Sequence, residues 1–301
     1  MSLLITGSIG IDTVETPYGK VTDVIGGTAI YSSLAAVPYG PVRLVGVVGE
    51  DFPDGALAPL QSREIDLAGL ERRAGSKTFR WTGKYEGAMN EAQTVDVSLN
   101  VLAEAGAKVP AAFADSRTVF LANTHPTLQR DMLAQVRDPW TVVCDTMNLW
   151  IENERASLLE TLAKVTGVIL NDGEARMLTG VVNVIEAGTA ILSMGPEFVV
   201  IKKGEHGAIL MTADAVVAMP ALPTREVRDP TGAGDSFAGG FLGYLNTQPT
   251  RDLAVLKRSV ARGTVAASFT IEDFSIRRLV DLTREQIEER VKSFLEMLRV
   301  E

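Results

Sequence analysis

The chain has 301 residues, with 29 Lys and Arg against 38 Asp and Glu, so its formal net charge is −9. This acidic balance argues against a nucleic-acid-binding or membrane-surface protein, and neither partner is expected. Apolar residues make up 46% and charged residues 22%, which is typical of a globular domain and excludes a disordered chain. One cysteine and two histidines exclude an intramolecular disulfide and a structural zinc centre.

Short strand-like runs alternate with helical patterns along the chain. A strand is predicted over 3–6 with no cationic leader before it, so we expect a cytoplasmic protein. Further strands are predicted over 43–48, 118–121, 141–144, 167–170, 198–201 and 208–211. Helices are predicted over 29–38, 127–137, 155–164, 173–179, 185–193, 235–245, 252–268 and 285–298. This alternation indicates an α/β fold with a mostly parallel sheet.

Two segments interrupt the alternation. Residues 12–24 resemble a hairpin, because Pro17 and Gly19 separate β-type residues, and residues 77–101 carry Phe79, Trp81 and Tyr85 among polar residues. Long structureless insertions are uncommon in compact domains, so we predict a small β lid beside the main sheet. The exposed edges of such a lid would allow a homodimer through lid strands.

The sharpest chemical signal is the string D-P-T-G-A-G-D-S-F-A-G-G over 229–240. Gly232, Ala233 and Gly234 stand where a loop should turn into a helix, and their N–H groups would have no intrahelical acceptor. With the positive end of the helix dipole, this turn would cradle phosphoryl oxygens. Asp235 lies beside this turn, where its carboxylate is placed to accept a proton. The alternative is a tight loop in which Asp235 only caps a helix.

The string resembles the D-T-x-G-A-G-D signature of the ribokinase/PfkB family of sugar and nucleoside kinases, with Pro230 in place of the usual threonine. Three more segments resemble family motifs in the family's order: the diglycine Gly26-Gly27, the N-x-x-E motif from Asn171 to Glu174, and the nucleotide loop from Lys203 to Gly207 in altered spacing. The resemblance implies one domain over 1–301. Its fold would be a ribokinase-like three-layer α/β/α core with a lid formed by about 12–24 and 77–101.

The resemblance also implies a reaction, which is ATP-dependent phosphoryl transfer to the hydroxymethyl group of a small sugar or polyol. Asp235 would be the general base, and the backbone amides of Gly232, Ala233 and Gly234 would form the anion hole. The nucleotide would be bound by Asn171, Glu174, Lys203, Gly204, Gly207 and Thr231. Glu174 would act on Mg²⁺ through water, and Asp229 with Thr231 would hold a monovalent cation such as K⁺.

Simpler structural alternatives accompany these roles. Asn171 and Glu174 also fit a capping box, and the two roles are compatible. Asp229 and Pro230 also fit a plain turn. Of Lys202 and Lys203, which end a predicted strand, either suits a phosphate contact or a solvated strand end.

The acceptor is less well defined by the sequence. The resemblance assigns Asp12, Gly26 and Gly27 to the substrate, although Asp12 also fits a turn. Ribokinases continue after the diglycine with a Lys and a sugar-binding Asn, whereas this chain continues with Thr28-Ala29-Ile30-Tyr31, which disfavours ribose.

Further substrate-binding candidates are Tyr31, Asn90, Asn123 and His125. His125 follows a predicted strand, at the edge where ligands collect in this architecture. An aromatic pocket would suit a nucleoside base or a pyranose face, so a nucleoside kinase is the alternative to a sugar kinase. The aromatic residues also fit a purely structural role, which is packing in the core or the lid.

Two other classes fit less well. A dinucleotide-binding oxidoreductase needs G-x-G-x-x-G after the first strand, whereas Gly7-Ser8-Ile9-Gly10 has the wrong spacing, and no Walker P-loop is present. A non-catalytic sugar or nucleoside binder would be expected to have lost Asp235 or the glycine loop, and both are present.

Overall fold

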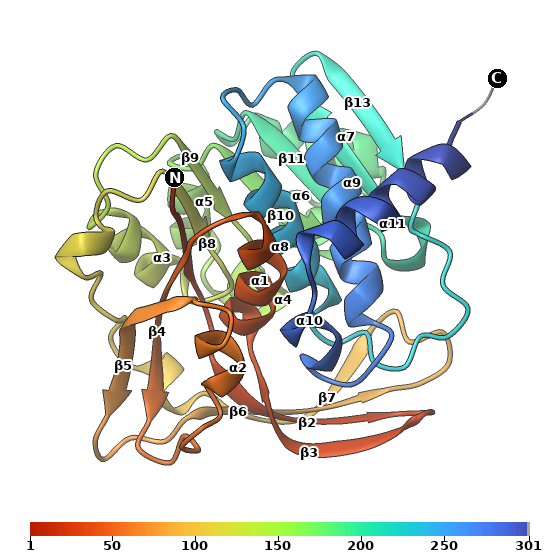
Figure 1. Ribbon diagram of the computed structural model, residues 1–301. Coiled ribbons are helices and arrows are strands. Elements are labelled where there is room, and N and C mark those ends of the chain that lie inside the picture. The colour runs from red at the N-terminus through yellow and green to blue at the C-terminus, as the bar shows by residue number, and fades with distance from the viewer. Residues whose placement is uncertain (300–301) are drawn as a thin grey trace.

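The computed structural model describes residues 1–299. Over these residues the chain forms a nine-stranded sheet of order β13-β12-β11-β10-β9-β8-β1-β4-β5 and a separate four-stranded sheet of order β3-β2-β6-β7. Helices cover both faces of the large sheet, and the small sheet lies across one end of it (Figure 1). The predicted three-layer α/β/α core with a mostly parallel sheet is therefore confirmed.

The large sheet contains every strand predicted outside the two interrupting segments. Its parallel strands are β1 (Leu3–Thr6), β4 (Val42–Gly49), β5 (Asp66–Arg73), β8 (Thr118–Leu121), β9 (Thr141–Cys144), β10 (Gly167–Asn171) and β11 (Phe198–Lys202); an antiparallel hairpin of β12 (Ala208–Thr212) and β13 (Ala215–Met219) completes it. The strands β5 and β13 were not predicted. Both lie at sheet edges, where solvent tolerates polar residues and no continuous apolar run is needed.

Eight helices follow the predicted periodicity, with shifted ends. They are α1 (Thr28–Ala36), α3 (Pro126–Leu133), α5 (Arg155–Leu162), α6 (Asp172–Thr179), α7 (Val184–Leu192), α8 (Ala233–Asn246), α9 (Leu253–Thr270) and α11 (Arg284–Met297). The helix α3 starts one residue early because Pro126 occupies its first turn behind the cap residue His125. Short helices that periodicity cannot reveal are α2 (Ala58–Gln61), α4 (Asn148–Asn153) and α10 (Arg277–Val280).

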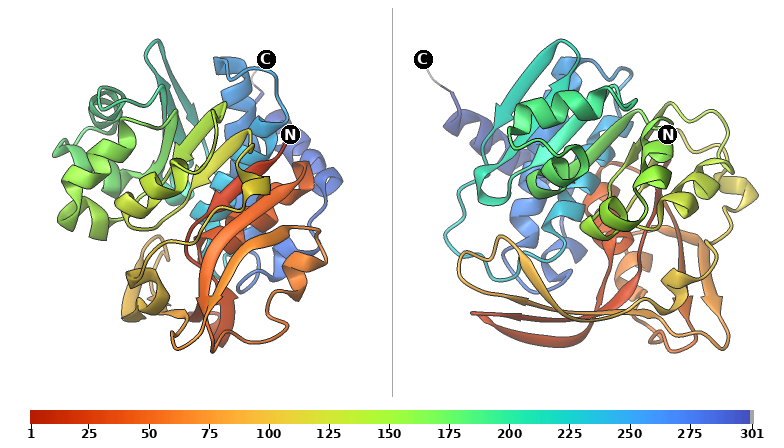
Figure 2. Two further views of the ribbon diagram at one scale, coloured as in Figure 1. Left: turned by 90° about the vertical axis from the view of Figure 1, so that its left-hand side faces the viewer. Right: turned by 180° about the vertical axis from the view of Figure 1, so that it is seen from behind.

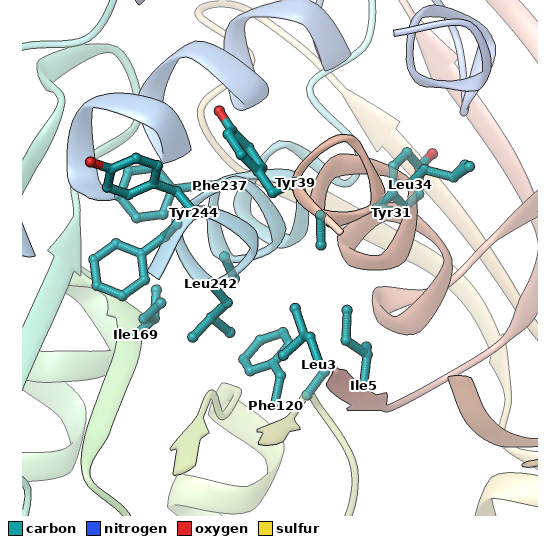
Figure 3. Packing of buried hydrophobic residues seen from close by; sticks show 14 of the residues in the cluster. Leu3, Ile5, Tyr31, Leu34, Tyr39, Phe120, Ile169, Phe237, Leu242 and Tyr244 are labelled. Carbon is teal, nitrogen blue, oxygen red and sulfur yellow. The ribbon is translucent and has the colours of Figure 1, made fainter. Parts of the chain in front are cut away.

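The core has two halves because successive residues of a strand point to opposite faces. In β1, Leu3 and Ile5 join the cluster that packs under α1, α8, α9 and α11, whereas Leu4 joins the cluster under α3, α5, α6 and α7. Figure 3 shows Leu3 and Ile5 beneath the helices of the first cluster. Each such side chain contributes about 1.5–3 kcal/mol when fully buried.

The two interrupting segments pair with each other. They form the hairpin of β2 (Gly10–Thr16) and β3 (Gly19–Gly26) and the hairpin of β6 (Phe79–Tyr85) and β7 (Ala92–Ser98), joined through parallel pairing of β2 with β6. In Figure 1 the arrowheads of β4 and β5 point toward this small sheet, and Figure 2 shows it at the same end from two further directions. The small sheet therefore stands at the carboxyl ends of the parallel strands.

Among residues 1–299, no single helix is long and apolar enough to cross a membrane. One pair, α6 and α7, passes the length and composition test only when taken together, and its two helices are bent by 63°.

Candidate active site

The anion loop, residues 229–235, leads into α8 with Gly232 in the cap position. Gly232 has φ of +75°, and a Cβ there would lie 2.3 Å from the ring of Tyr31. The Ala233 N–H donates to the Pro230 carbonyl at 3.1 Å, so it is not free for a ligand as predicted. Within the described chain, the N–H groups of Gly232, Gly234 and Asp235 have no backbone acceptor outside the helix. The available amides are therefore those of Gly232, Gly234 and Asp235.

Asp235 is the third residue of α8 rather than its first, because the helix begins two residues before the predicted position. Burial raises the pKa of its carboxyl group above the ordinary value, and the ammonium group of Lys202 acts in the opposite direction. A Cβ on Gly234 would lie 2.8 Å from Lys202 Nζ, so the glycine leaves room for that side chain. Lys202, the last residue of β11, lies against the anion loop.

Three carboxyl groups lie near Lys202: Asp145, Glu174 and Asp235. Asp145 follows β9, is 5% exposed, and its Oδ1 has no hydrogen-bond partner within residues 1–299. Burial raises its pKa, the charge of Asp235 adds to this shift, and Lys202 opposes it. Sequence reasoning missed Asp145. The available signal was a carboxylate directly after an apolar strand, at the sheet edge where ligands collect.

Gln129 holds Asp145 in place from α3. Its side-chain amide donates to the carbonyls of Leu121 at 2.9 Å and Asp145 at 3.1 Å. The ends of β8 and β9 are thereby tied to one buried side chain.

Asn171 and Glu174 form the predicted capping box at the start of α6. The Glu174 N–H donates to Asn171 Oδ1, and the Asn171 N–H donates to Glu174 Oε2, both at 2.7 Å. These bonds leave Glu174 Oε1 for other partners. Among residues 1–299 no group of three or more His, Cys, Asp or Glu side chains is arranged to hold a metal ion.

Asp12 lies on β2 against the diglycine. A Cβ on Gly26 would lie 1.8 Å from Asp12 Oδ2, and Gly27 has φ of +98° with a Cβ position 2.4 Å from the Ser8 carbonyl. Only glycines leave this space. Asp12 Oδ1 has no partner within the described chain, and burial, followed by the charges of Asp229 and Asp235, raises its pKa to about 7.

Asp229 organises the anion loop by a turn. Its Oδ1 accepts the Thr231 N–H at 2.9 Å, and its Oδ2 accepts the Ser275 N–H at 3.0 Å. Burial raises the pKa of Asp229, and these hydrogen bonds oppose the shift. Thr231 Oγ1 lies 3.3 Å from the hydroxyl of Tyr85, which belongs to the small sheet. The turn predicted as the simpler alternative is therefore present.

Tyr31 was predicted to touch the substrate, but its side chain is packed beneath Gly232 and is 2% exposed. It supports the anion loop from below, since α1 and α8 pack side by side. Local spacing could not reveal this packing.

Asn123, His125 and Trp150 form a polar and aromatic cluster at the ends of β8 and β9. His125 Nδ1 accepts the Thr127 N–H at 3.2 Å, and its ring meets Trp150 edge to face at 5.2 Å between centroids. Trp150 Nε1 donates to Asn123 Oδ1 at 2.9 Å. Trp150 was not predicted, because α4 is too short to show periodicity.

The predicted nucleotide loop is a tight turn after β11. The Lys203 N–H donates to the Gly207 carbonyl at 2.7 Å, and Gly204 and Gly207 have φ of +54° and +88°. Asn90, predicted to bind the acceptor, instead donates from Nδ2 to Glu205 Oε1 at 2.9 Å. It therefore lies on the nucleotide loop, because the turn between β6 and β7 reaches across to that loop.

The sequence and the fold both match known kinases. The family described as pfkB family carbohydrate kinase matches residues 3–281. A cytidine kinase from Thermococcus kodakarensis is 32% identical over 272 residues, which cover 87% of this chain and 95% of that protein.

Solved structures extend the comparison at the level of the fold. A nucleoside kinase from Burkholderia thailandensis in complex with inosine superposes with a TM-score of 0.78 at 18% identity, covering 98% of this chain and 99% of that one. A fructokinase from Vibrio cholerae bound to fructose, ADP and calcium gives 0.79 at 18% identity, covering 98% of both chains. With the family match running through the diglycine, N-x-x-E and anion-loop segments, the chain belongs to the pfkB family of carbohydrate kinases.

Proposed function

We propose that this protein transfers the γ-phosphoryl group of ATP to the hydroxymethyl group of a nucleoside. The observation that carries the proposal is the arrangement at the start of α8, where Asp235 stands beside the ammonium group of Lys202 and beside amides that have no acceptor among residues 1–299. Phosphoryl transfer asks for alignment and charge stabilisation more than for covalent work.

On the acceptor side, two carboxylates have distinct roles in the proposal. Asp12, wedged against Gly26 with one free oxygen, accepts hydrogen bonds from substrate hydroxyls. Asp235 takes the proton from the attacking hydroxyl. Its raised pKa makes it a stronger base than an exposed aspartate, which favours proton transfer near neutral pH.

On the donor side, the amides of Gly232, Gly234 and Asp235 with Lys202 stabilise the charge on the transferred group. The carboxylate oxygens of Asp145 and Glu174 would hold Mg²⁺ through waters, and the ion would there supply positive charge to offset that of the phosphates. A monovalent cation beside Asp229 and Thr231 remains a prediction, which comparing rates in K⁺ and Na⁺ would test.

The choice of a nucleoside rests on two observations. The Thermococcus relative, whose whole length this chain nearly spans, is a cytidine kinase. The cluster of Asn123, His125 and Trp150 offers two aromatic rings and the side-chain amide of Asn123 beyond the ends of β8 and β9, which suit a heterocyclic base. A small sugar or polyol, the acceptor first expected from the sequence, is the second candidate because the fold is shared with a fructokinase.

The test is ADP release with Mg-ATP across a panel of pyrimidine and purine nucleosides, hexoses, pentoses and polyols. We expect the highest kcat/KM with a nucleoside, and substitution of Trp150 by alanine to raise the nucleoside KM more than kcat falls. A preference for a free sugar would replace the nucleoside proposal. If no acceptor in the panel supports ADP release, the binding-protein alternative would be favoured.

A further inference from the structure

The turn between β6 and β7 touches both halves of the site. We call residues 85–90 the strap. At its first residue, the Tyr85 hydroxyl lies 3.3 Å from Thr231 Oγ1 in the anion loop. At its last residue, Asn90 Nδ2 donates to Glu205 Oε1 in the nucleotide loop at 2.9 Å. One short segment of the small sheet therefore contacts two loops of the core that are separate in sequence.

The strap moves with the small sheet because it is fastened to it. Met89 is 8% exposed and packs in one cluster with Val14 and Tyr85. Its N–H donates to the Glu86 carbonyl at 3.0 Å, which closes the turn. Any change in the position of the small sheet is thus carried to Asn90.

The nucleotide loop is shaped to receive Asn90. A Cβ on Gly204 would lie 2.9 Å from Asn90 Oδ1, closer than side chains normally pack, so the bare glycine lets the amide approach the loop. Glu205, the next residue along the chain, accepts the hydrogen bond from Asn90. The loop is therefore completed by a side chain from the small sheet.

We infer that Asn90 is a positioning residue that couples nucleotide binding to closure of the small sheet over the acceptor. This inference rests on the proposed function, because it takes residues 203–207 as the nucleotide loop. When the small sheet is closed over the acceptor site, Asn90 holds Glu205 and Gly204 in their observed places. The nucleotide loop then has its binding conformation before the nucleotide arrives. Linkage requires the reverse as well: bound nucleotide favours the closed sheet by the same factor.

The first test needs no acceptor and uses ADP as the probe. In the full-length protein, we expect ADP to slow hydrogen exchange of the amides in 79–98. Asn90→Ala should abolish this protection and weaken ADP binding by about three- to tenfold, which is within the range for the net loss of one ordinary intramolecular hydrogen bond. Glu91→Ala, an exposed neighbour in the same turn, is the matched control and should behave as the wild type.

A charge test separates positioning from a general loss of structure. Asn90→Asp sets a carboxylate against Glu205 and should weaken ADP binding more than Asn90→Ala does. Adding Glu205→Gln should restore both ADP affinity and lid protection, because a carboxylate then meets an amide. A residue that only supported the fold would show no such rescue.

The outcomes separate this inference from the proposed function. If the wild type binds ADP but residues 79–98 gain no protection, or if Asn90→Ala keeps the full protection, the coupling is wrong while the kinase proposal stands. A wild type that binds neither ADP nor ATP would overturn the proposed function itself. Thermal unfolding of each variant identifies any that fails to fold, and the rescue pair then decides.

Discussion

At the scale of single residues, the site concentrates negative charge in buried places. Asp12, Asp145 and Asp235 all have raised pKa values because burial disfavours the carboxylate, and Lys202 compensates only the last two. Such groups cost stability when ionised and are typical of functional sites. Substitution of these residues should therefore change turnover or the pH dependence of stability, which substitution of an exposed carboxylate should not.

Asp235→Asn tests the base. We expect turnover to fall by about 10²- to 10⁴-fold, the usual contribution of a general base, while ADP affinity changes little because the backbone amides remain. Steady-state rates and calorimetric titration with ADP measure the two effects. Asp214→Asn, at an exposed turn beside β12, is the control and should leave both unchanged. Turnover close to that of the wild type would remove Asp235 from the mechanism.

Asp12 should make stability depend on pH. Its pKa rises from 3.8 to about 7 in the folded protein, so the folded state binds the proton more tightly than the unfolded state. The stabilisation is fully present below about pH 3.8 and is lost as pH rises through about 7. A shift of this size corresponds to about 4 kcal/mol in the free energy of unfolding.

Urea unfolding at pH 5 and pH 8 measures this effect. Asp12→Asn should lose less stability than the wild type between these pH values, because the amide does not titrate. Asp96→Asn, an exposed carboxylate of the same small sheet, should follow the wild type. Parallel curves for the wild type and Asp12→Asn would contradict the buried, protonated state.

At the scale of elements, the start of α8 depends on a glycine for two separate reasons. Gly232 has a positive φ, and its missing side chain lets the ring of Tyr31 approach. Gly180, at the end of α6, has almost the same φ, +73°, but open space around it. The pair separates backbone strain from steric overlap.

Gly180→Ala should cost about 1 kcal/mol of unfolding free energy from strain alone. Gly232→Ala should cost more, because a Cβ 2.3 Å from the Tyr31 ring forces α1 or the anion loop to move. It should also abolish activity, whereas Gly180→Ala keeps it. Denaturant unfolding and ADP-release rates measure both, and equal costs for the two variants would mean that the Tyr31 contact carries no constraint.

At the scale of the whole molecule, the small sheet has two edges. Its end strands are β3 and β7, and β7 exposes Val95 at 66% and Val97 at 49%. Exposed apolar side chains on an unpaired strand edge favour pairing with another chain. The homodimer through lid strands, expected from the sequence, thus remains a prediction with a defined surface.

Sedimentation velocity at micromolar concentration tests this surface. We expect a dimer for the wild type and a monomer after combined Val95→Lys and Val97→Lys. Val216→Lys, 54% exposed on the edge strand β13 of the large sheet, is the control and should remain dimeric. A wild-type monomer would exclude the lid dimer.

Features that depend on neighbouring residues could be predicted from the amino-acid sequence. The apolar runs specified the buried strands, since a strand covered on both faces needs a continuous apolar segment. The glycines and Asp235 of the anion loop could be predicted because a turn from a loop into a helix requires particular residue types at adjacent positions. The capping box of Asn171 and Glu174 could be predicted for the same reason, because its two residues are only three positions apart.

The contacts between residues distant in sequence became visible in the folded chain alone. Strand order brings Asp145 and Lys202 near Asp235, helix packing places Tyr31 under Gly232, and the pairing of two hairpins carries Asn90 to Glu205. Each of these contacts joins segments far apart in the chain. Their proximity results from the burial of whole faces of sheets and helices, which no short spacing of residues encodes.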